Sequence, residues 1–497
     1  MTIGTLSSTM WNARNVVQDI TAASRARSLE TYRRRLDSLE AMYDGHFAGY
    51  EDLVDRRLAA AIQSGPGARR LIKSHWPRKN WVRKIVNLRS RLYQGDPQRN
   101  LTAATDRKPK PRQEEQLQAM LDDLDWQRFF RRTERRANLL QSGVVQIVGN
   151  GWTGLPQLRF HSLARVWLRQ HPAYPNDLDA ALGVAIELPD QDDEYAVADH
   201  RATARYLRYL PVERDGERLG WRLDLTDREG TVHATYAGEA LRKGDIDRPC
   251  LPMLPLVKVD IAEGDEFYPV GNDALMDEAL DIALREADLG AAQSLAALPM
   301  LQARGYTEDD ATSISVGPGK VVHHSDPEAR LEWLSATTDW LAIDTVNERN
   351  LKRFLVTEGV PPTEADLEPQ WRSGRALHAA RQMLYEERAD AMDRWQDHEK
   401  AVFAKLARFC AWWFGDMRVC RGRGDTPLAP WTQMDWRGCG LKVSFPNPGP
   451  LPSEEEVDEL WHKRITAGLA SIEEYRRKVL GVETTAPQTL SNSGADA

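Results

Sequence analysis

Residues 271–299, GNDALMDEALDIALREADLGAAQSLAALP, carry a clear helical pattern. Four apolar residues recur along this stretch at steps of three, four and seven: Leu275, Ala279, Ile282 and Leu289. Such steps place side chains on one face, which predicts an amphipathic α-helix. Asn272 or Asp273 is a suitable N-cap, and Pro299 ends the helix because proline has no amide hydrogen.

The same predicted helix is rich in acids. Residues 273–288 contain a single base, Arg285, and six acids: Asp273, Asp277, Glu278, Asp281, Glu286 and Asp288. The helix therefore has a distinctly acidic face, and its charge is a feature that any functional interpretation must explain.

Two more helices are predicted downstream. The first covers residues 340–358 and is ended by Gly359 and the pair Pro361 and Pro362. After a loop, the forty residues 375–414 contain neither glycine nor proline. At a rise of 1.5 Å per residue they make a helix about 60 Å long, which is longer than a small domain is wide. A helix of this length usually braces a large or oligomeric body.

Residues 299–339, between the first two helices, are predicted to form short strands and turns. The segment SVGPGKVVHH, residues 315–324, is the most hairpin-like part. A phosphate-binding loop would need glycine in place of Ile314, and Ser or Thr after Lys320, where Val321 stands. A hairpin turn is therefore the better interpretation.

The same region offers no convincing metal or catalytic site. His323 and His324 are adjacent, so on a strand they point to opposite faces and cannot bind one metal together. Glu308, Asp309 and Asp310 could bind Mg²⁺, but no further acidic motif accompanies them, which favours a solvated turn. No nucleophile, general base or metal cluster appears elsewhere, so neither enzymatic activity nor a cofactor is predicted.

The N-terminal region to about residue 93 is predicted to be helical. Apolar residues recur there at steps of three and four: Leu29, Tyr32, Leu36, Leu39 and Tyr43. A second helix of the same kind is predicted over Asn80 to Tyr93, with arginines and lysines around its apolar face.

A polar linker, DRKPKPRQEEQ, follows at residues 106–116. Pro109 and Pro111 are expected to exclude helix from it. Helix is expected to resume at about Glu114 and to continue without a break to Leu140.

From about residue 144 the apolar period changes to two, which is the period of a β-strand. Six β-rich runs follow: 144–148, 166–168, 181–188, 204–210, 221–225 and 231–236. No helix-length pattern separates these runs, so they predict one antiparallel sheet and argue against a parallel dinucleotide-binding sheet. Residues 249–269 are rich in proline, and no strand is predicted there. The predicted fold class is α+β, mainly helical.

Composition sets further bounds on the protein. The chain has 497 residues and a formal charge of −8, so the molecule as a whole is not a cationic surface for DNA or lipid. With 41% hydrophobic and 28% charged residues it is expected to fold, and its length suggests about three domains. Its longest uncharged run, residues 289–303, is too short to cross a bilayer, so no membrane association is expected.

The cysteines and tryptophans complete the composition. Four cysteines at wide spacings, without a secretory leader, predict free thiols in a reducing compartment: Cys250, Cys410, Cys420 and Cys439. Sixteen tryptophans outnumber the tyrosines and the phenylalanines. They could fill domain cores or lie where subunits meet, and both interpretations stay open.

The order of these elements resembles the portal proteins of tailed double-stranded DNA bacteriophages. The resemblance is carried by an acidic helix, a small β-rich excursion, a second helix, a proline-ended loop and one very long helix. The stretches that suggest it most are YPVGNDALMDEALDIALREADLGAAQSLAALP (268–299), ISVGPGKVVHH (314–324), FLVTEGVPP (354–362) and WRSGRALHAARQMLYEERADAMDRW (371–395). The tail DELWHKRITAGLASIEEYRRKVLG (458–481) looks like the helical crown of such chains. The likeness covers about residues 30–480.

The resemblance implies a portal fold with wing, stem, clip, tunnel loop, long helix and crown. It assigns residues 1–270 to a wing, with a helical N-terminus and an inserted antiparallel sheet. The other parts follow in chain order: 271–298 first stem helix, 299–339 clip, 340–359 second stem helix, 360–374 tunnel loop, 375–414 long helix, 415–449 β return of the wing, 450–482 crown and 483–497 disordered tail.

The resemblance also implies a function. Portal proteins form rings, usually of twelve subunits, at one vertex of the capsid, and DNA is packaged and ejected through the ring. The implied partners are the terminase large subunit, the major capsid and scaffolding proteins, a head-completion or tail adaptor protein, and the double-stranded DNA. The implied location is the virion, and the host cytoplasm during assembly. A portal hydrolyses nothing itself, because a separate ATPase supplies the energy.

Three sets of candidate site residues follow from the resemblance. The tunnel loop, with Pro361, Pro362, Trp371 and Arg372, is expected to contact DNA, although Trp371 could instead pack against the long helix. The stem acids Asp277, Asp281 and Asp288 could line the channel and repel phosphates, or could pair with Lys and Arg of a neighbouring subunit. Lys320, His323 and His324 of the clip are candidates for docking the packaging motor.

Two other functions compete with this interpretation. A nucleic-acid-processing enzyme of the packaging machinery would need a phosphate loop or an acidic metal site, for which only Glu308 and Asp309 are candidates. An intracellular coiled-coil scaffold would use the long helix, but residues 386–400 are mostly polar and charged, against the apolar heptads that pairing requires.

Overall fold

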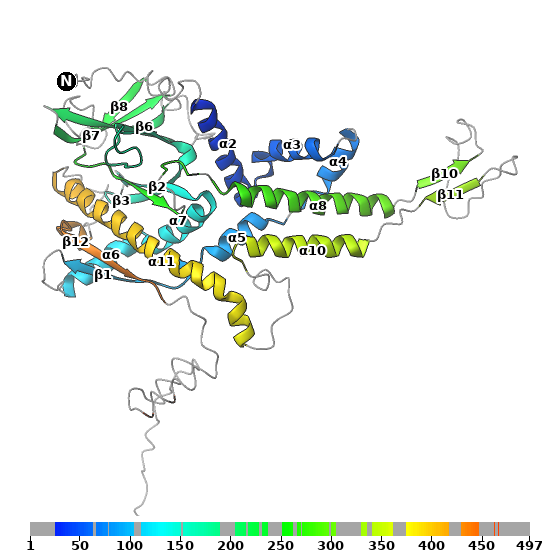
Figure 1. The fold of residues 1–497 in the computed structure, drawn as a ribbon. Coiled ribbons are helices and arrows are strands. Elements are labelled where there is room, and N and C mark those ends of the chain that lie inside the picture. Colours follow the sequence, from blue (N-terminus) through cyan, green and yellow to red (C-terminus); the bar gives the residue numbers. More distant parts are fainter. Residues whose placement is uncertain are drawn as a thin grey trace, which may run out of the picture.

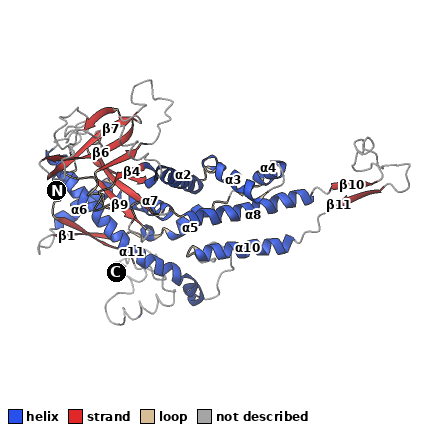
Figure 2. Ribbon diagram, turned by 45° about the horizontal axis from the view of Figure 1, so that its top comes forward, coloured by secondary structure: helices blue, strands red, loops and turns tan. Residues whose placement is uncertain are grey.

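The structure, a computed structural model, describes residues 25–62, 66–77, 79–103, 111–150, 153–188, 204–214, 217–227, 231–236, 251–261, 266–269, 271–297, 300–304, 330–334, 340–360, 374–416 and 429–446, with residues 462 and 466. In these ranges the chain forms a body of helices and antiparallel sheets, from which two helices project side by side (Figure 1). A two-stranded hairpin lies beyond the far ends of these helices in both ribbon views (Figures 1 and 2). The architecture is α+β, as the sequence predicts.

The two projecting helices, called the stalk here, are α8 (Asp273–Ala297) and α10 (Trp340–Thr357). The α-helices of the body are α2 (Arg25–Asp44), α3 (Glu51–Ala61), α4 (Pro66–Ser74), α5 (Trp81–Arg89), α6 (Pro111–Asp123), α7 (Trp126–Leu140) and α11 (Gly374–Cys410). Short helical turns join or extend them at η2 (Phe47–Gly49), η3 (Leu92–Gln94), η4 (Leu163–Arg165), η7 (Ala411–Asp416) and η8 (Pro430–Gln433).

The strands of the described chain form four antiparallel groups. One sheet has the order β3-β2-β9 and consists of β2 (Ser142–Gly149), β3 (Pro156–Ser162) and β9 (Leu256–Asp260). A second has the order β4-β5-β6-β7-β8, with β4 (Val166–Arg169), β5 (Gly183–Glu187), β6 (Ala204–Arg214), β7 (Glu217–Asp227) and β8 (Val232–Tyr236). The remaining pairs are β1 (Gln98–Ala103) with β12 (Cys439–Ser444), and β10 (Met300–Arg304) with β11 (Arg330–Leu334).

The expectation of one inserted sheet was wrong, because the strands divide into two sheets. The proline-rich stretch 249–269 contains β9, which was not predicted. Pro255 directly precedes this strand, and its carbonyl oxygen accepts a hydrogen bond from the amide of Ile147 at 2.9 Å. A proline at a strand start costs no ladder bond, so its presence did not exclude a strand.

Two expectations about the linker and the following helix were also wrong. Pro111 does not exclude helix but is the first residue of α6, a position where a missing amide hydrogen is tolerated. The expected continuous helix from Glu114 to Leu140 is two helices, α6 and α7. They are separated at Asp125, whose φ of 50° is left-handed. This break turns Trp126 into the core, where it is fully buried.

The helix expected over Asn80 to Tyr93 is shorter than predicted. It is capped by Asn80, whose side chain accepts a hydrogen bond from the amide of Arg83, and it ends at Arg89. Leu92 then donates its amide to Oε1 of Glu134 at 3.0 Å instead of continuing the helical ladder. The buried carboxylate of Glu134, from another helix, thus replaces the backbone carbonyl that would accept this hydrogen bond in a helix. Local helix propensity does not predict such a replacement.

The core of the body is built around aromatic side chains. Tyr93, Phe130 and Trp395 meet with ring centroids 5.6–6.4 Å apart, and Trp126 lies 4.9 Å from Phe130. Seven tryptophans are buried in the described chain: Trp81, Trp126, Trp221, Trp395, Trp413, Trp431 and Trp436. For these seven the core interpretation is confirmed.

The long helix α11 crosses the body and packs against β12, β9 and β2 (Figure 1). Its apolar side chains Val402, Phe403 and Leu406 are fully buried against these elements. Because this face is covered by the chain itself, it is not free for the coiled-coil pairing that a scaffold would use.

Candidate functional site

The candidate functional site is the stalk and its attachment to the body. Helix α8 begins where expected, with the carbonyl oxygen of Asn272 accepting from the amide of Met276 at 3.2 Å. The predicted apolar residues Leu275, Ala279 and Ile282 are buried, and on α10 Leu351, Phe354 and Leu355 are buried as well. The two helices pack against each other through these faces, so the base of the stalk has an apolar core.

Helices α3 and α4 brace one side of α8. Nε2 of His75, which follows α4, lies 2.7 Å from the hydroxyl of Ser294. A Cβ at Gly290 would lie 3.4 Å from the His75 side chain, an ordinary van der Waals contact, so the two helices are closely packed at this point. From α3, Arg57 forms ion pairs with Asp281 at 2.9 Å and with Asp277 at 3.6 Å. The stalk is therefore held to the body along part of its length.

An ion cluster holds the base of α10. Arg89 of α5 lies 3.3 Å from Glu358, at the end of α10, and 3.9 Å from Glu387 of α11. Burial raises the pKa of both Glu358 and Glu387. Gly359 follows with a φ of 68°, the left-handed conformation that ends a helix. The cluster therefore joins the two helices from which residues 361–373 depart.

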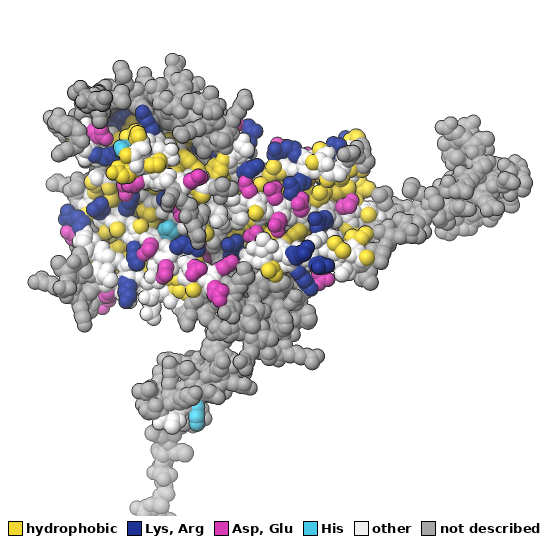
Figure 3. Space-filling view, in the orientation of Figure 1, with side chains coloured by type: hydrophobic (Ala, Val, Ile, Leu, Met, Phe, Trp, Pro, Cys, Tyr) yellow, Lys and Arg dark blue, Asp and Glu magenta, His cyan; other side chains and the backbone are white. Residues whose placement is uncertain are grey.

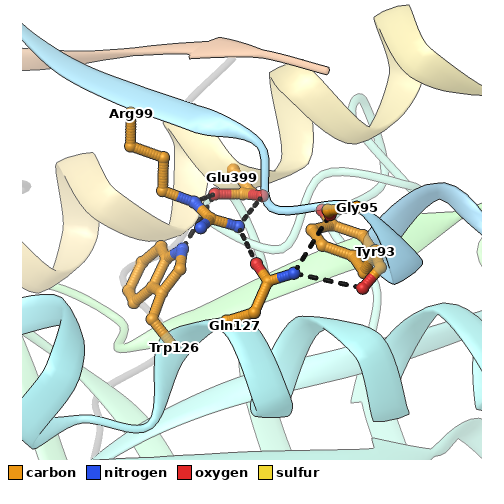
Figure 4. A network of polar contacts seen from close by, with 6 residues as sticks. All are labelled: Tyr93, Gly95, Arg99, Trp126, Gln127 and Glu399. Carbon is orange, nitrogen blue, oxygen red and sulfur yellow. Dashed lines mark hydrogen bonds and ion pairs between the residues drawn. The ribbon is translucent and has the colours of Figure 1, made fainter. Parts of the chain in front are cut away.

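A second, deeply buried network fixes α11 to the body (Figure 4). Glu399 has no exposed surface and accepts hydrogen bonds from Arg99 at 2.7 Å and from the indole of Trp126 at 2.8 Å. Arg99 also donates to Gln127, whose side-chain amide donates to the carbonyl oxygens of Tyr93 and Gly95. Since β1, α7, α11 and the segment after α5 all take part, the network locks four separate parts of the chain together.

The structure places one of the three predicted sets of site residues. Asp277 and Asp288 are exposed on α8, and the side chain of Asp281 is half exposed. Asp277 and Asp281 share Arg57, so part of their charge is balanced within the chain. They lie at steps of four and seven, hence on one face of the helix.

The other two sets lie outside the described residues. Pro361, Pro362, Trp371 and Arg372 fall between the ends of α10 and α11, and Lys320, His323 and His324 fall between β10 and β11. Glu308 and Asp309 also fall between β10 and β11. Of the expected crown, residues 450–482, the structure describes only residues 462 and 466. For these residues the sequence interpretation stays a prediction.

One exposed surface of the stalk was missed in the sequence. On α10, Val346, Arg349, Arg353 and Val356 are all exposed, the two valines by 55% and 51%. They recur at steps of three, four and three and so form one stripe. The spacing of these four residues can be read from the sequence, but it does not tell whether the stripe faces the body or the solvent. The structure shows that it faces solvent, because the opposite side of α10 packs against α8. Figure 3 shows acidic side chains over α8 and basic side chains over α10.

A hollow of about 230 Å³ lies between α8 and α10. It is smaller than the roughly 300–1,000 Å³ of a small-molecule site, and its lining includes Lys79, Arg285, Asp344 and Glu348. Charges of both signs surround it without converging on one point. We therefore assign it no ligand.

The described residues also bear on metal binding and on membrane insertion. The described residues contain no group of three or more His, Cys, Asp or Glu side chains that could bind a metal ion. None of the described helices is long and apolar enough to span a membrane. Cys410 and Cys439 are free thiols, as the sequence predicts for them, and burial raises the pKa of the Cys410 thiol far above its usual value.

Comparison with known proteins gives similarity at the level of structure alone. No family model and no curated protein matches the chain. One similar solved structure is a chain from the "Virion of native gene transfer agent (GTA) particle", at 13% identity and a TM-score of 0.34. Another is a chain from the "Neck of empty GTA particle computed with C6 symmetry", at 11% identity and a TM-score of 0.36. Each match covers 85% of this chain and 96% of the other. TM-scores this low do not establish a function for this chain.

Proposed function

We propose that this chain is the subunit of a portal ring, which forms the channel for viral DNA at one capsid vertex. The observation that carries the proposal is the stalk. Two long helices project side by side from an α+β body, support a two-stranded hairpin at their far end, and connect back to the body at the start of a 37-residue helix. This arrangement follows the order of stem, clip, tunnel loop and long helix that the sequence resembles.

The exposed surface of the stalk supports an oligomer. Val346 and Val356 are half exposed on the stalk, and a ring would bury such faces between neighbouring copies. We propose that α8 and α10 form the stem and that a ring, of about twelve copies, surrounds the DNA.

The proposed channel needs contacts that let DNA move. A wall that bound many phosphates tightly would hold the polymer through multiple salt-dependent contacts, and a chain with a net charge of −8 avoids this. In the proposal the segment 361–373, with Trp371 and Arg372, forms the narrowest ring and contacts DNA weakly. The ion cluster of Arg89, Glu358 and Glu387 holds the two helices that carry it.

The proposal also assigns partners. The clip beyond β10 and β11, with Lys320, His323 and His324, docks the terminase large subunit during packaging and a head-completion or tail adaptor protein afterwards. The outer wing contacts the major capsid and scaffolding proteins. The ring itself hydrolyses nothing, and it works in the virion after assembly in the host cytoplasm.

Negative-stain electron microscopy with native mass spectrometry of the purified chain tests this function. Twelve copies of the 56.3 kDa chain would give a ring of about 0.7 MDa with a central hole. A monomer or dimer at every protein and salt concentration would remove the proposal, and would return attention to an enzyme or scaffold.

A further inference from the structure

The exposed stripe of α10 combines apolar and basic side chains. Val346, Arg349, Arg353 and Val356 lie on the side of α10 opposite the buried residues that pack toward α8. Neither arginine forms an ion pair with another described residue. The two arginines lie between the half-exposed valines, and this combination suits a contact with protein better than one with DNA, because phosphates offer no apolar partner to a valine.

Helix α8 carries the complementary surface. Asp277, Asp281 and Asp288 lie at steps of four and seven and form an acidic stripe, over the first part of which lies Arg57 of α3. Asp277 and Asp281 share one base, Arg57, and Asp288 forms no ion pair with another described residue. Arg285 is exposed on the same face, four residues after Asp281 and three before Asp288, so the three acids meet two bases, Arg57 and Arg285, and the stripe keeps one net negative charge to offer a partner.

The two stripes also match in length. Val346 and Val356 are ten residues apart, which is about 15 Å along a helix, and Asp277 and Asp288 are eleven apart, about 17 Å. They lie on different faces of the stalk, so one copy can use both at the same time. Two different surfaces that fit each other generate a head-to-tail contact, which closes into a ring when the rotation allows.

We propose that the Val346, Arg349, Arg353 and Val356 stripe of one subunit binds the Asp277, Asp281 and Asp288 stripe of the next copy. This inference rests on the proposed ring and names the contact that closes it. The valines lose exposed surface, and the opposite charges set orientation and register. It assigns the three acids to a subunit contact and not to the wall of the channel.

Charge reversal with complementation tests the contact. One variant carries Arg349→Glu and Arg353→Glu, and the other carries Asp281→Lys and Asp288→Lys. Each alone is expected to lose the ring and to run as the 56.3 kDa chain in native mass spectrometry. Mixed in equal amounts, they are expected to regain the ring, because every contact again joins opposite charges.

Two controls separate this effect from misfolding. Arg349→Lys with Arg353→Lys keeps the charge and is expected to keep the ring. Arg131→Glu with Arg132→Glu makes the same charge change on exposed residues of α7, and is expected to leave the ring intact. Far-ultraviolet circular dichroism and the thermal midpoint of each variant show whether the subunit still folds.

The outcomes are distinguishable. If both reversed variants form rings of unchanged mass, the inference is wrong while the ring stands, and altered DNA passage through those rings would instead assign the basic stripe to DNA. If the reversed variants fold but their mixture forms no ring, the two stripes do not pair. If the unmodified chain forms no ring, the proposed function fails together with the inference.

Discussion

Glu399 is an acid without exposed surface, and its charge is balanced within the chain by Arg99. At the scale of single residues, such buried charged groups show where this protein is least tolerant of substitution. A buried charge is stable only while its partners are present, because the low dielectric makes an unpaired charge costly. An exposed pair, by contrast, has water as an alternative partner.

We expect Glu399→Ala to destabilise the body strongly. It leaves the Arg99 guanidinium and the Trp126 indole buried without their acceptor, at a cost of about 3–5 kcal/mol. The matched control is Asp435→Ala, which breaks an exposed pair with Arg437 and is expected to cost less than about 1 kcal/mol. Urea denaturation measures the free energy of unfolding of both variants. Equal losses of free energy would show that burial of the Glu399 and Arg99 pair does not set the cost of breaking it.

Glu134 gives the stability a pH dependence. Burial raises its pKa to about 7, and its Oε2 is buried without a hydrogen-bond partner in the described chain. Between the unfolded value of 4.5 and about 7, the folded state binds a proton that the unfolded state does not. The free energy of unfolding therefore falls as pH rises through this window, by up to about 3 kcal/mol.

We expect Glu134→Gln to remove this loss. The amide keeps an oxygen acceptor for the amide of Leu92 but cannot ionise, so the variant should be the more stable form above pH 7. Urea midpoints at pH 5 and pH 8 measure the slope. Glu115→Gln, at an exposed position of α6, is the control and should keep the slope of the unmodified protein. A Glu134→Gln protein with that same slope would contradict the assignment.

Gly359 is required by its backbone at the end of α10. With φ at 68°, an alanine costs about 1–2 kcal/mol, and its Cβ would lie 2.1 Å from Oε1 of Glu387. We expect Gly359→Ala to lower the thermal midpoint, because Glu387 must move away. Gly67→Ala, with no atom within 4 Å of the added Cβ, should leave the midpoint unchanged or higher. Indistinguishable midpoints would show that the base of α10 tolerates a side chain.

At the scale of elements, the two helices that flank residues 361–373 have unlike supports. The end of α10 is held by the ion cluster with Arg89, which also reaches Glu387 of α11, whereas α11 has a second support farther along, the network around Glu399. Residues 361–373 thus connect two helices that are both fixed to the body. Under the proposed function, substitutions in this segment change contact with DNA and leave the body unaffected.

Packaging assays on assembled rings test this expectation. Trp371→Ala and Arg372→Ala are each expected to slow DNA packaging or to reduce DNA retention, through loss of a steric contact and of a weak phosphate contact. Arg372→Lys keeps the charge and should retain most of the activity. Unchanged rates and retention in both alanine variants would leave residues 361–373 with only a structural role.

At the scale of the whole molecule, the hairpin of β10 and β11 lies apart from the body, beyond the far ends of the stalk helices (Figure 1). Arg304 and Arg330 are paired partners in β10 and β11, so the chain leaves and re-enters the hairpin at neighbouring points. A short glycine-serine turn can therefore replace residues 305–329. The proposed stem contact lies on α8 and α10, away from this tip.

We expect the variant with residues 305–329 replaced to form rings of normal subunit number. It should fail to bind the terminase large subunit, because the proposed docking residues are removed. Native mass spectrometry measures the first outcome and co-sedimentation with the terminase subunit the second. Terminase binding that survives the replacement would place the docking surface elsewhere.

The long elements could be predicted from local sequence. Helix α8 begins at Asp273 and α11 covers most of residues 375–414, because apolar period, caps and helix breakers are properties of neighbouring residues. The strands β2 and β4 to β8 were predicted by the same logic. The acidic face of α8 was also visible, since it follows from spacing alone.

Contacts between distant residues could not be predicted in this way. β9 pairs with β2, which lies more than a hundred residues earlier in the chain. The break between α6 and α7 lets the indole of Trp126 donate to Glu399. Val346 lies on the exposed side of α10. Each of these contacts depends on a partner that is remote in sequence, so no local sequence pattern predicts it. The sequence by itself determined the long helices, the strands β2 and β4 to β8, and the charges that they carry, because these follow from short-range periodicity. Only the tertiary structure decided which charges are buried in pairs and which stripes are left exposed, because burial is a property of the packed chain.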